Sequence, residues 1–164
     1  MPAGSTYTPI ATTTLGSAQA SVTFSSFSGY TDIYIVCDTA FASTTNFQIR
    51  FNSDTGTNYS NTLIQGNGTT AISARQSSQT RIVAGYNGTT SSDRAIFNIS
   101  LMNYANTSVY KTVLIRMNNA SSETLAQVGL WRSTSAITSI QFALQNGGNF
   151  SVGSTFTLYG IASA

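Results

Sequence analysis

The five acidic side chains are the first candidates for chemistry, because a pair of carboxylates can hydrolyse a glycosidic bond. They are Asp32, Asp38, Asp54, Asp93 and Glu123. A glycosidase needs two carboxyl groups facing each other across a cleft, roughly 5–9.5 Å apart. These five are scattered along the chain, with Asp54 in a turn-like segment and Asp93 in a loop rich in Ser and Thr. We therefore expect a protein that is not an enzyme.

Residues 52–58, Asn-Ser-Asp-Thr-Gly-Thr-Asn, offer many oxygen atoms of the kind that bind calcium. A calcium loop needs several acids at alternating positions and a closing bidentate Glu, and this segment has Asp54 alone. A turn in which Asp54 hydrogen-bonds its own backbone is the favoured interpretation. We expect no metal and no other cofactor.

The chain has one cysteine, Cys37, and no histidine. This composition excludes a histidine-based triad, a histidine metal site and an internal disulfide. A nucleophilic role for Cys37 would lack the histidine that activates such a thiol. The sequence instead predicts a buried, unreactive thiol on a strand, as suits a protein made in a reducing cytoplasm.

Aromatic side chains are frequent, with nine Phe, eight Tyr and one Trp. Sugar-binding β-sandwiches stack exposed aromatic faces on pyranose rings, and four tyrosines lie near the ends of expected strands: Tyr59, Tyr86, Tyr104 and Tyr110. Packing against neighbouring residues, with the phenol reaching water, is the favoured interpretation for each of them. Trp131 could pack in the core as readily as bind a ligand. No ligand-binding residue is assigned from the sequence.

The composition points to a β protein with few charges. The 164 residues include 24 Ser and 25 Thr but one Lys and one Glu, and only 7% are charged. The length suits one domain with a sizeable core. Scarce helix formers and abundant β-branched Thr make long helices improbable.

The charged residues form no tract. Seven cations and five anions leave a net charge of +2, and the cations are spread as Arg50, Arg75, Arg81, Arg94, Lys111, Arg116 and Arg132. Nucleic-acid binding needs a clustered basic stripe, so we expect none. All twelve charges lie between Asp32 and Arg132, which leaves both ends neutral. Such ends would suit contact with other protein.

The first 31 residues carry no charge and are broken by Ser, Thr and Gly. They lack the basic start of a signal peptide and the continuous apolar run of a membrane-spanning helix. We expect no association with a membrane.

The dominant pattern is an alternation of apolar and polar residues with a period of two, which is typical of half-buried strands. Phe47, Ile49 and Phe51 alternate with polar residues, and residues 95–101 repeat the pattern. Similar runs occur at residues 21–24, 32–37, 58–64, 80–84, 113–117, 124–131, 137–144 and 155–161. Gly- and Asn-rich turns separate them. These features predict an all-β protein, a single antiparallel β-sandwich of jelly-roll type with about ten short strands.

The N-terminal segment fits this pattern least well. Pro2 and Pro9 fall within it, and its apolar residues Tyr7, Ile10 and Leu15 are too widely spaced for a regular strand. The sequence therefore predicts an N-terminal arm over residues 1–20 and a β-sandwich domain over residues 21–164.

Four stretches of the chain resemble a family of small β-sandwich structural proteins of tailed bacteriophages. They are residues 7–26, 49–60, 129–140 and 148–161. The more specific motifs are Arg-Phe-Asn-x-Asp-x-Gly-x-Asn-Tyr-Ser at residues 50–60 and Phe-x-Leu-Tyr-Gly-Ile at residues 156–161. The resemblance implies a virion component, at the capsid surface or in the tail fibre apparatus. It transfers no catalytic or ligand residues.

The leading hypothesis is a non-enzymatic virion protein, a capsid-surface decoration (cement) or head-fibre protein made in the host cytoplasm. Its short chain lacks the long stalk of a tail fibre. It would form a homo-oligomer, with a trimer as the first expectation, and contact other virion proteins such as the major capsid or fibre protein. The alternative is a tail-fibre or tail-tip adhesin that binds host surface glycan.

Overall fold

A computed structural model describes residues 6–42, 45–85 and 93–162. This part of the chain contains twelve strands, a single-turn 3-10 segment at Gln145–Gly147 and no α-helix, so the expected all-β class is confirmed. The strands are β1 (Tyr7–Thr14), β2 (Ser21–Ser25), β3 (Asp32–Thr39), β4 (Phe47–Phe51), β5 (Tyr59–Gly66), β6 (Ala71–Gln79), β7 (Ile82–Ala84), β8 (Ala95–Leu101), β9 (Lys111–Asn119), β10 (Glu123–Trp131), β11 (Ser139–Leu144) and β12 (Thr155–Ile161).

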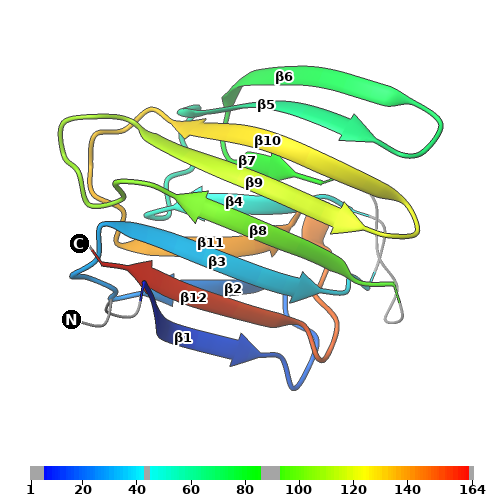
Figure 1. The fold of residues 1–164 in the computed structure, drawn as a ribbon, viewed down its shortest axis with the longest axis horizontal. Helices are drawn as coiled ribbons and strands as arrows, with labels where there is room; N and C mark the ends of the chain where they lie inside the picture. Colours follow the sequence, from blue (N-terminus) through cyan, green and yellow to red (C-terminus); the bar gives the residue numbers. More distant parts are fainter. Residues whose placement is uncertain (1–5, 43–44, 86–92, 163–164) are drawn as a thin grey trace.

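The strands form two antiparallel sheets that pack face to face (Figure 1). The larger sheet has eight strands in the order β1-β12-β3-β8-β9-β10-β5-β6. The smaller sheet has four strands in the order β2-β11-β4-β7. The expected β-sandwich is therefore confirmed.

The pairing of the strands is that of a jelly roll. The first strand pairs with the last (β1 with β12), and β2 with β11, β3 with β8 and β4 with β7 follow in nested order. Successive pairs alternate between the two sheets, as expected when one long double ribbon rolls up. Two inserted hairpins widen the larger sheet. The hairpin β5–β6 lies between β4 and β7 in the sequence, and the hairpin β9–β10 lies between β8 and β11.

The expectation of an N-terminal arm over residues 1–20 is wrong for most of these residues. Tyr7–Thr14 is the edge strand β1, paired along its length with β12, and Leu15 is buried in the core. The register shifts between Pro9 and Ala11, so the inward and outward positions change places partway along the strand. This bulge hides the alternation in the sequence. Residues 1–5 lie outside the described part.

Strand β6 is the second element that the pattern did not predict. Eight of its nine residues are exposed, because it lies at the edge of the larger sheet beyond the smaller one. A strand with both faces exposed to solvent needs no alternation of apolar and polar residues, and the sequence Ala-Ile-Ser-Ala-Arg-Gln-Ser-Ser-Gln has none.

The core lies between the sheets and is built from inward-facing aromatic rings. Phe47 of β4 stacks on Phe97 of β8 with ring centroids 4.2 Å apart, which joins the centres of the two sheets. Phe142 of β11 stacks on Phe156 of β12 at 5.8 Å. All four rings are at most 1% exposed. Fully burying each such side chain contributes roughly 1.5–3 kcal/mol.

Gly129 of β10 marks a close approach between the layers. A Cβ atom there would lie 2.7 Å from Cδ1 of Ile82 on β7 and 2.9 Å from Cγ1 of Val113 on β9. Only glycine fits between these side chains without displacing them.

We therefore predict that Gly129→Ala lowers the free energy of unfolding by about 1–3 kcal/mol, because the added methyl group overpacks the core. The matched control is Gly66→Ala on the paired strand β5, where nothing lies within 4 Å of the added atom. The control is expected to be neutral or slightly stabilising, by less than about 1 kcal/mol. Urea unfolding followed by the fluorescence of Trp131 measures both; an equal effect of the two substitutions would contradict the prediction.

Candidate functional site

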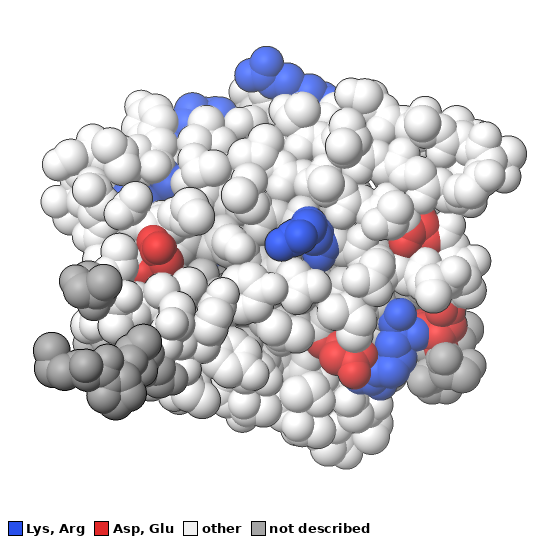
Figure 2. Space-filling view, in the orientation of Figure 1, with Lys and Arg blue, Asp and Glu red and all other residues white. Residues whose placement is uncertain are grey.

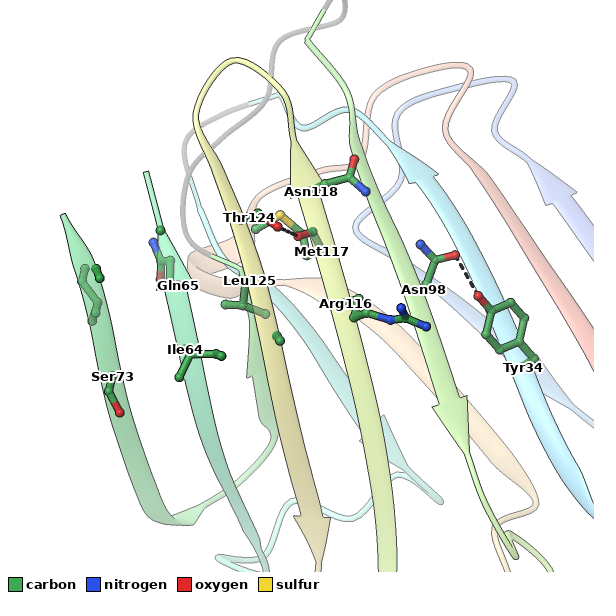
Figure 3. A pocket seen from close by; sticks show the side chains of 14 residues that line it. Tyr34, Ile64, Gln65, Ser73, Asn98, Arg116, Met117, Asn118, Thr124 and Leu125 are labelled. Atoms are coloured by element: carbon green, nitrogen blue, oxygen red, sulfur yellow. Dashed lines mark hydrogen bonds between the residues drawn. The ribbon is translucent and has the colours of Figure 1, made fainter. Parts of the chain in front are cut away.

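The outward face of the larger sheet carries two adjoining hollows, of about 780 Å³ and 430 Å³. They share five residues, which define what we call the outer groove: Tyr34, Ile64, Asn98, Arg116 and Ala126. These residues come from β3, β5, β8, β9 and β10, so the groove crosses the strands (Figure 3).

Small side chains on adjacent strands explain the hollow. The register places Arg116 of β9 beside Ala126 of β10, and Ala126 beside Ile64 of β5. Because Ala126 is short, a space opens between the longer side chains on either side of it. Gly66 of β5 and Ala71 of β6 are paired with each other and line the same hollow, and their lack of long side chains extends it two residues beyond Ile64.

Hydrogen-bond donors line one side of the groove. The Tyr34 hydroxyl donates to Asn98 Oδ1 at 3.0 Å, which fixes the amide and turns its Nδ2 toward β9 (Figure 3). Arg116 is opposite Asn98 in the register, and Asn118 follows two residues later on the same face. Neither Arg116 nor Asn118 hydrogen-bonds another described residue through its side chain, nor does Asn98 Nδ2. These donors are available to a ligand.

Apolar side chains line the rest of the groove. Ile64, Leu114 and Val128 are 63%, 49% and 39% exposed. Leu114 and Val128 are directly opposite each other on β9 and β10. The outer groove therefore combines hydrogen-bond donors with exposed aliphatic side chains, which suits a ligand with both acceptor groups and an apolar face.

The groove is electropositive at a single point. Five of the seven cationic side chains hydrogen-bond within the fold, through contacts such as Arg94 with Asp38 and Lys111 with two backbone carbonyls. Arg75 and Arg116, both on the outward face, hydrogen-bond none of the residues that the structure describes through their side chains. None of the five acidic residues lines the groove. Figure 2 shows an isolated cationic side chain in the middle of a largely uncharged face.

The acidic candidates are dispersed through the structure. Asp38 forms an ion pair with Arg94, and Asp32 accepts a hydrogen bond from the backbone of Asn103. Asp93 accepts from the Ser121 hydroxyl, and Glu123 accepts from the Gln65 amide. Each carboxylate is thus engaged in a local structural contact.

Asp54 lies in a turn, as expected. Its carboxylate accepts hydrogen bonds from the backbone of Gly56 at 2.7 Å, from Asn58 at 2.9 Å and from the indole of Trp131 at 2.6 Å. Burial raises the pKa of Asp54, but these three hydrogen bonds outweigh it, and the pKa lies below the ordinary value of 3.8. The calcium interpretation gains no support, because N–H donors surround the carboxylate and the described residues contain no cluster of metal-ligating side chains.

Cys37 is fully buried on β3, as the sequence predicted. Burial raises the pKa of its thiol well above the ordinary value, because a thiolate would be desolvated there. Its low reactivity toward thiol reagents stays a prediction.

The tyrosines singled out from the sequence do not form the groove. Tyr59 and Tyr104 are buried, which confirms packing for these two. The expectation that the phenol reaches water is wrong for Tyr59, because its hydroxyl is buried and hydrogen-bonds the backbone of Phe51, and burial raises its pKa to about 12. Trp131 is also buried and stacks on Tyr59. Tyr110 is 54% exposed but does not line the groove, and Tyr86 lies outside the described residues.

Tyr34 is the aromatic residue of the groove, and the sequence pattern did not single it out. The signal was present in the alternation of β3, where Ile33, Ile35 and Cys37 face inward. Tyr34, between them, must then face outward.

Neither a scan against protein-family models nor a search of curated proteins finds a match for this chain. Among the described residues, no helix is long and apolar enough to cross a membrane.

We predict that Asp54→Ala lowers the free energy of unfolding at neutral pH by about 1–3 kcal/mol, because it leaves the Trp131 indole N–H without its acceptor. The folded-state pKa is lowered, so the stabilisation is present above the unfolded-state pKa and is lost as the pH falls through the folded-state value. Unfolding measured from neutral to acidic pH should show the variant and wild type converging in acid. Thr55→Ala, at an exposed position in the same turn, is the control; equal losses in the two variants would refute the assigned role.

Proposed function

We propose that this protein is a non-enzymatic structural protein of a bacteriophage particle, acting at the capsid surface as a decoration or head-fibre protein. Two independent features support this proposal. The sequence resembles small β-sandwich virion proteins, and the jelly roll is an architecture common among viral capsid proteins, although lectins use it too. Fold alone does not establish a function, so a surface feature has to carry the proposal.

That feature is an uncharged edge of the sandwich. The four strands β1, β2, β11 and β12 contain no charged residue. They come from the two ends of the sequence, yet β1 pairs with β12, β2 pairs with β11, and Phe142 of β11 stacks on Phe156 of β12. The two neutral ends of the chain thus combine into one continuous neutral region. Charged groups are depleted where proteins bury surface against each other, because desolvating an ion is costly.

The exposed side chains of this uncharged edge are hydroxyl-rich. The Thr12 hydroxyl of β1 donates a hydrogen bond to the Thr157 hydroxyl of β12 at 3.3 Å. The hydroxyls of Thr14 and Thr155 form a second hydrogen bond between the same two strands, at 3.4 Å. The first strand also contains Pro9 and a bulge, both of which discourage indefinite addition of further strands at a free edge. A side-chain contact of defined size with a sister subunit or with the capsid protein suits this edge.

The non-enzymatic part of the proposal draws on the placement of the acids. All five carboxylates accept hydrogen bonds from neighbouring groups in the fold, and none lines the outer groove. A hydrolase that used a carboxylate pair would need two of them directed at one cleft.

We predict that Thr12→Lys weakens self-association and attachment to the particle by about tenfold or more, because each buried lysine would lose its hydration. The control is Thr112→Lys, which puts the same exposed charge on β9, away from the uncharged edge. Sedimentation measures the oligomer, expected to be a trimer, and co-sedimentation with particles that lack the protein measures attachment. Full assembly of Thr12→Lys, or equal losses in both variants, would contradict the role of the edge.

Gold-labelled antibody on purified particles tests the location. Label over the head supports a decoration or head-fibre protein. Absence of the protein from purified particles, established by mass spectrometry, would overturn the proposal.

A second candidate function is binding of host surface glycan as a tail-fibre or tail-tip adhesin. The outer groove is the observation that favours it, because Tyr34, Asn98 and Arg116 present an aromatic ring, an amide and a guanidinium at one hollow. Gold label over the tail tip would favour this candidate over the first.

A further inference from the structure

We propose that the outer groove recognises an acidic saccharide, with Arg116 and Asn98 holding the carboxylate of a sugar acid. This inference rests on the second candidate function, glycan binding, and specifies the chemical class of the ligand.

The charge of the ligand follows from the donors. Arg116 has five N–H groups and is exposed, without a hydrogen bond or ion pair to any described residue. The Tyr34 hydroxyl donates to Asn98 Oδ1, which orients the amide so that its Nδ2 donor lies on the side of Arg116 on the neighbouring strand. A planar guanidinium beside an amide N–H matches a carboxylate, which accepts two parallel hydrogen bonds. No acidic side chain of the protein lines the groove to compete for Arg116.

The size of the space follows from the register. Arg116 and Ile64 lie two strands apart, with Ala126 between them. Neighbouring strands are about 4.8 Å apart, so the two side chains stand roughly 10 Å from each other at their bases. Figure 3 shows the Arg116 side chain directed toward Asn98 on β8, so a sugar acid with its carboxylate at Arg116 leaves Ala126 and Ile64 to contact the apolar C–H face of its ring or of an adjoining sugar unit. The 780 Å³ of the larger hollow leaves room for adjoining sugar units.

The groove favours a saccharide over an extended peptide. Strands β9 and β10 are interior strands whose backbone groups are paired on both sides, so the sheet face has no backbone donors or acceptors to offer. An extended peptide gains most of its affinity from such backbone pairing at a sheet edge. The groove instead offers side-chain amides and hydroxyls, among them Asn118 and Ser73, which suit the hydroxyl groups of a sugar.

Binding of acidic oligosaccharides to the full chain tests the proposal. The probes are tetragalacturonate, tetramannuronate and α2,8-linked sialic acid tetramer, each compared by calorimetry with its neutral methyl ester. We expect at least one acidic probe to bind, and its ester to bind about tenfold more weakly or worse, because a charge-assisted hydrogen bond is lost.

The variants are Arg116→Gln and its matched control Arg75→Gln, which removes the same charge from the same face outside the two hollows. Arg116→Gln should weaken binding of the acidic probe about tenfold or more, and Arg116→Lys should restore part of it. Arg75→Gln should change it by less than about twofold. Equal losses in Arg116→Gln and Arg75→Gln would show diffuse electrostatic attraction and overturn the site.

The remaining outcomes separate this inference from the function on which it rests. Equal binding of acid and ester would overturn the acidic assignment and leave glycan binding standing. Binding of no saccharide would overturn both. Tighter, Arg116-dependent binding of hexaglutamate than of any saccharide would overturn the saccharide class and indicate an acidic protein partner.

Discussion

The stacking of phenylalanine rings between the two sheets is the contact on which the rest of the structure depends. Phe47 and Phe97, with centroids 4.2 Å apart, join a central strand of the smaller sheet to a central strand of the larger one. Phe142 and Phe156 do the same nearer the edge that the chain termini form. A protein interior packs as densely as an organic crystal, so these rings tolerate neither a slip of register nor a change of spacing. The glycine at position 129 is one visible consequence, since the layers meet too closely there for any side chain.

The inner packing also determines the outer surface. Successive side chains of a strand point to opposite faces of the sheet, so Arg116 faces outward because its neighbours Ile115 and Met117 are buried in the core. The pairing of β9 with β10 then places Arg116 beside Ala126, and the short alanine opens the groove. The groove lies on paired strands and not on loops, so the backbone that carries its side chains is held in place.

The few charges of the molecule are used in two distinct ways. Most cations and all five acids hydrogen-bond within the fold, and Arg94 and Asp38 also form an ion pair. Two arginines, Arg75 and Arg116, have no hydrogen bond or ion pair to another described residue, and both lie on the outward face of the larger sheet. The neutral edge suits burial against protein, and the lone guanidinium of the groove suits an anionic ligand.

The sequence by itself determined the class of fold, because alternation and turn residues are local properties that neighbouring positions reveal. It also predicted the buried Cys37 and the turn at Asp54. It did not reveal β1, where a bulge reverses the alternation, or β6, which has no buried face. Only the tertiary structure decided that Tyr34, Asn98, Arg116, Ala126 and Ile64 meet in one groove and that the two neutral ends form one edge. Strand pairing across about 60 residues sets the neighbours in the groove, and pairing across more than a hundred residues forms the edge. Both depend on how all the inward side chains pack together, which no local stretch of sequence contains.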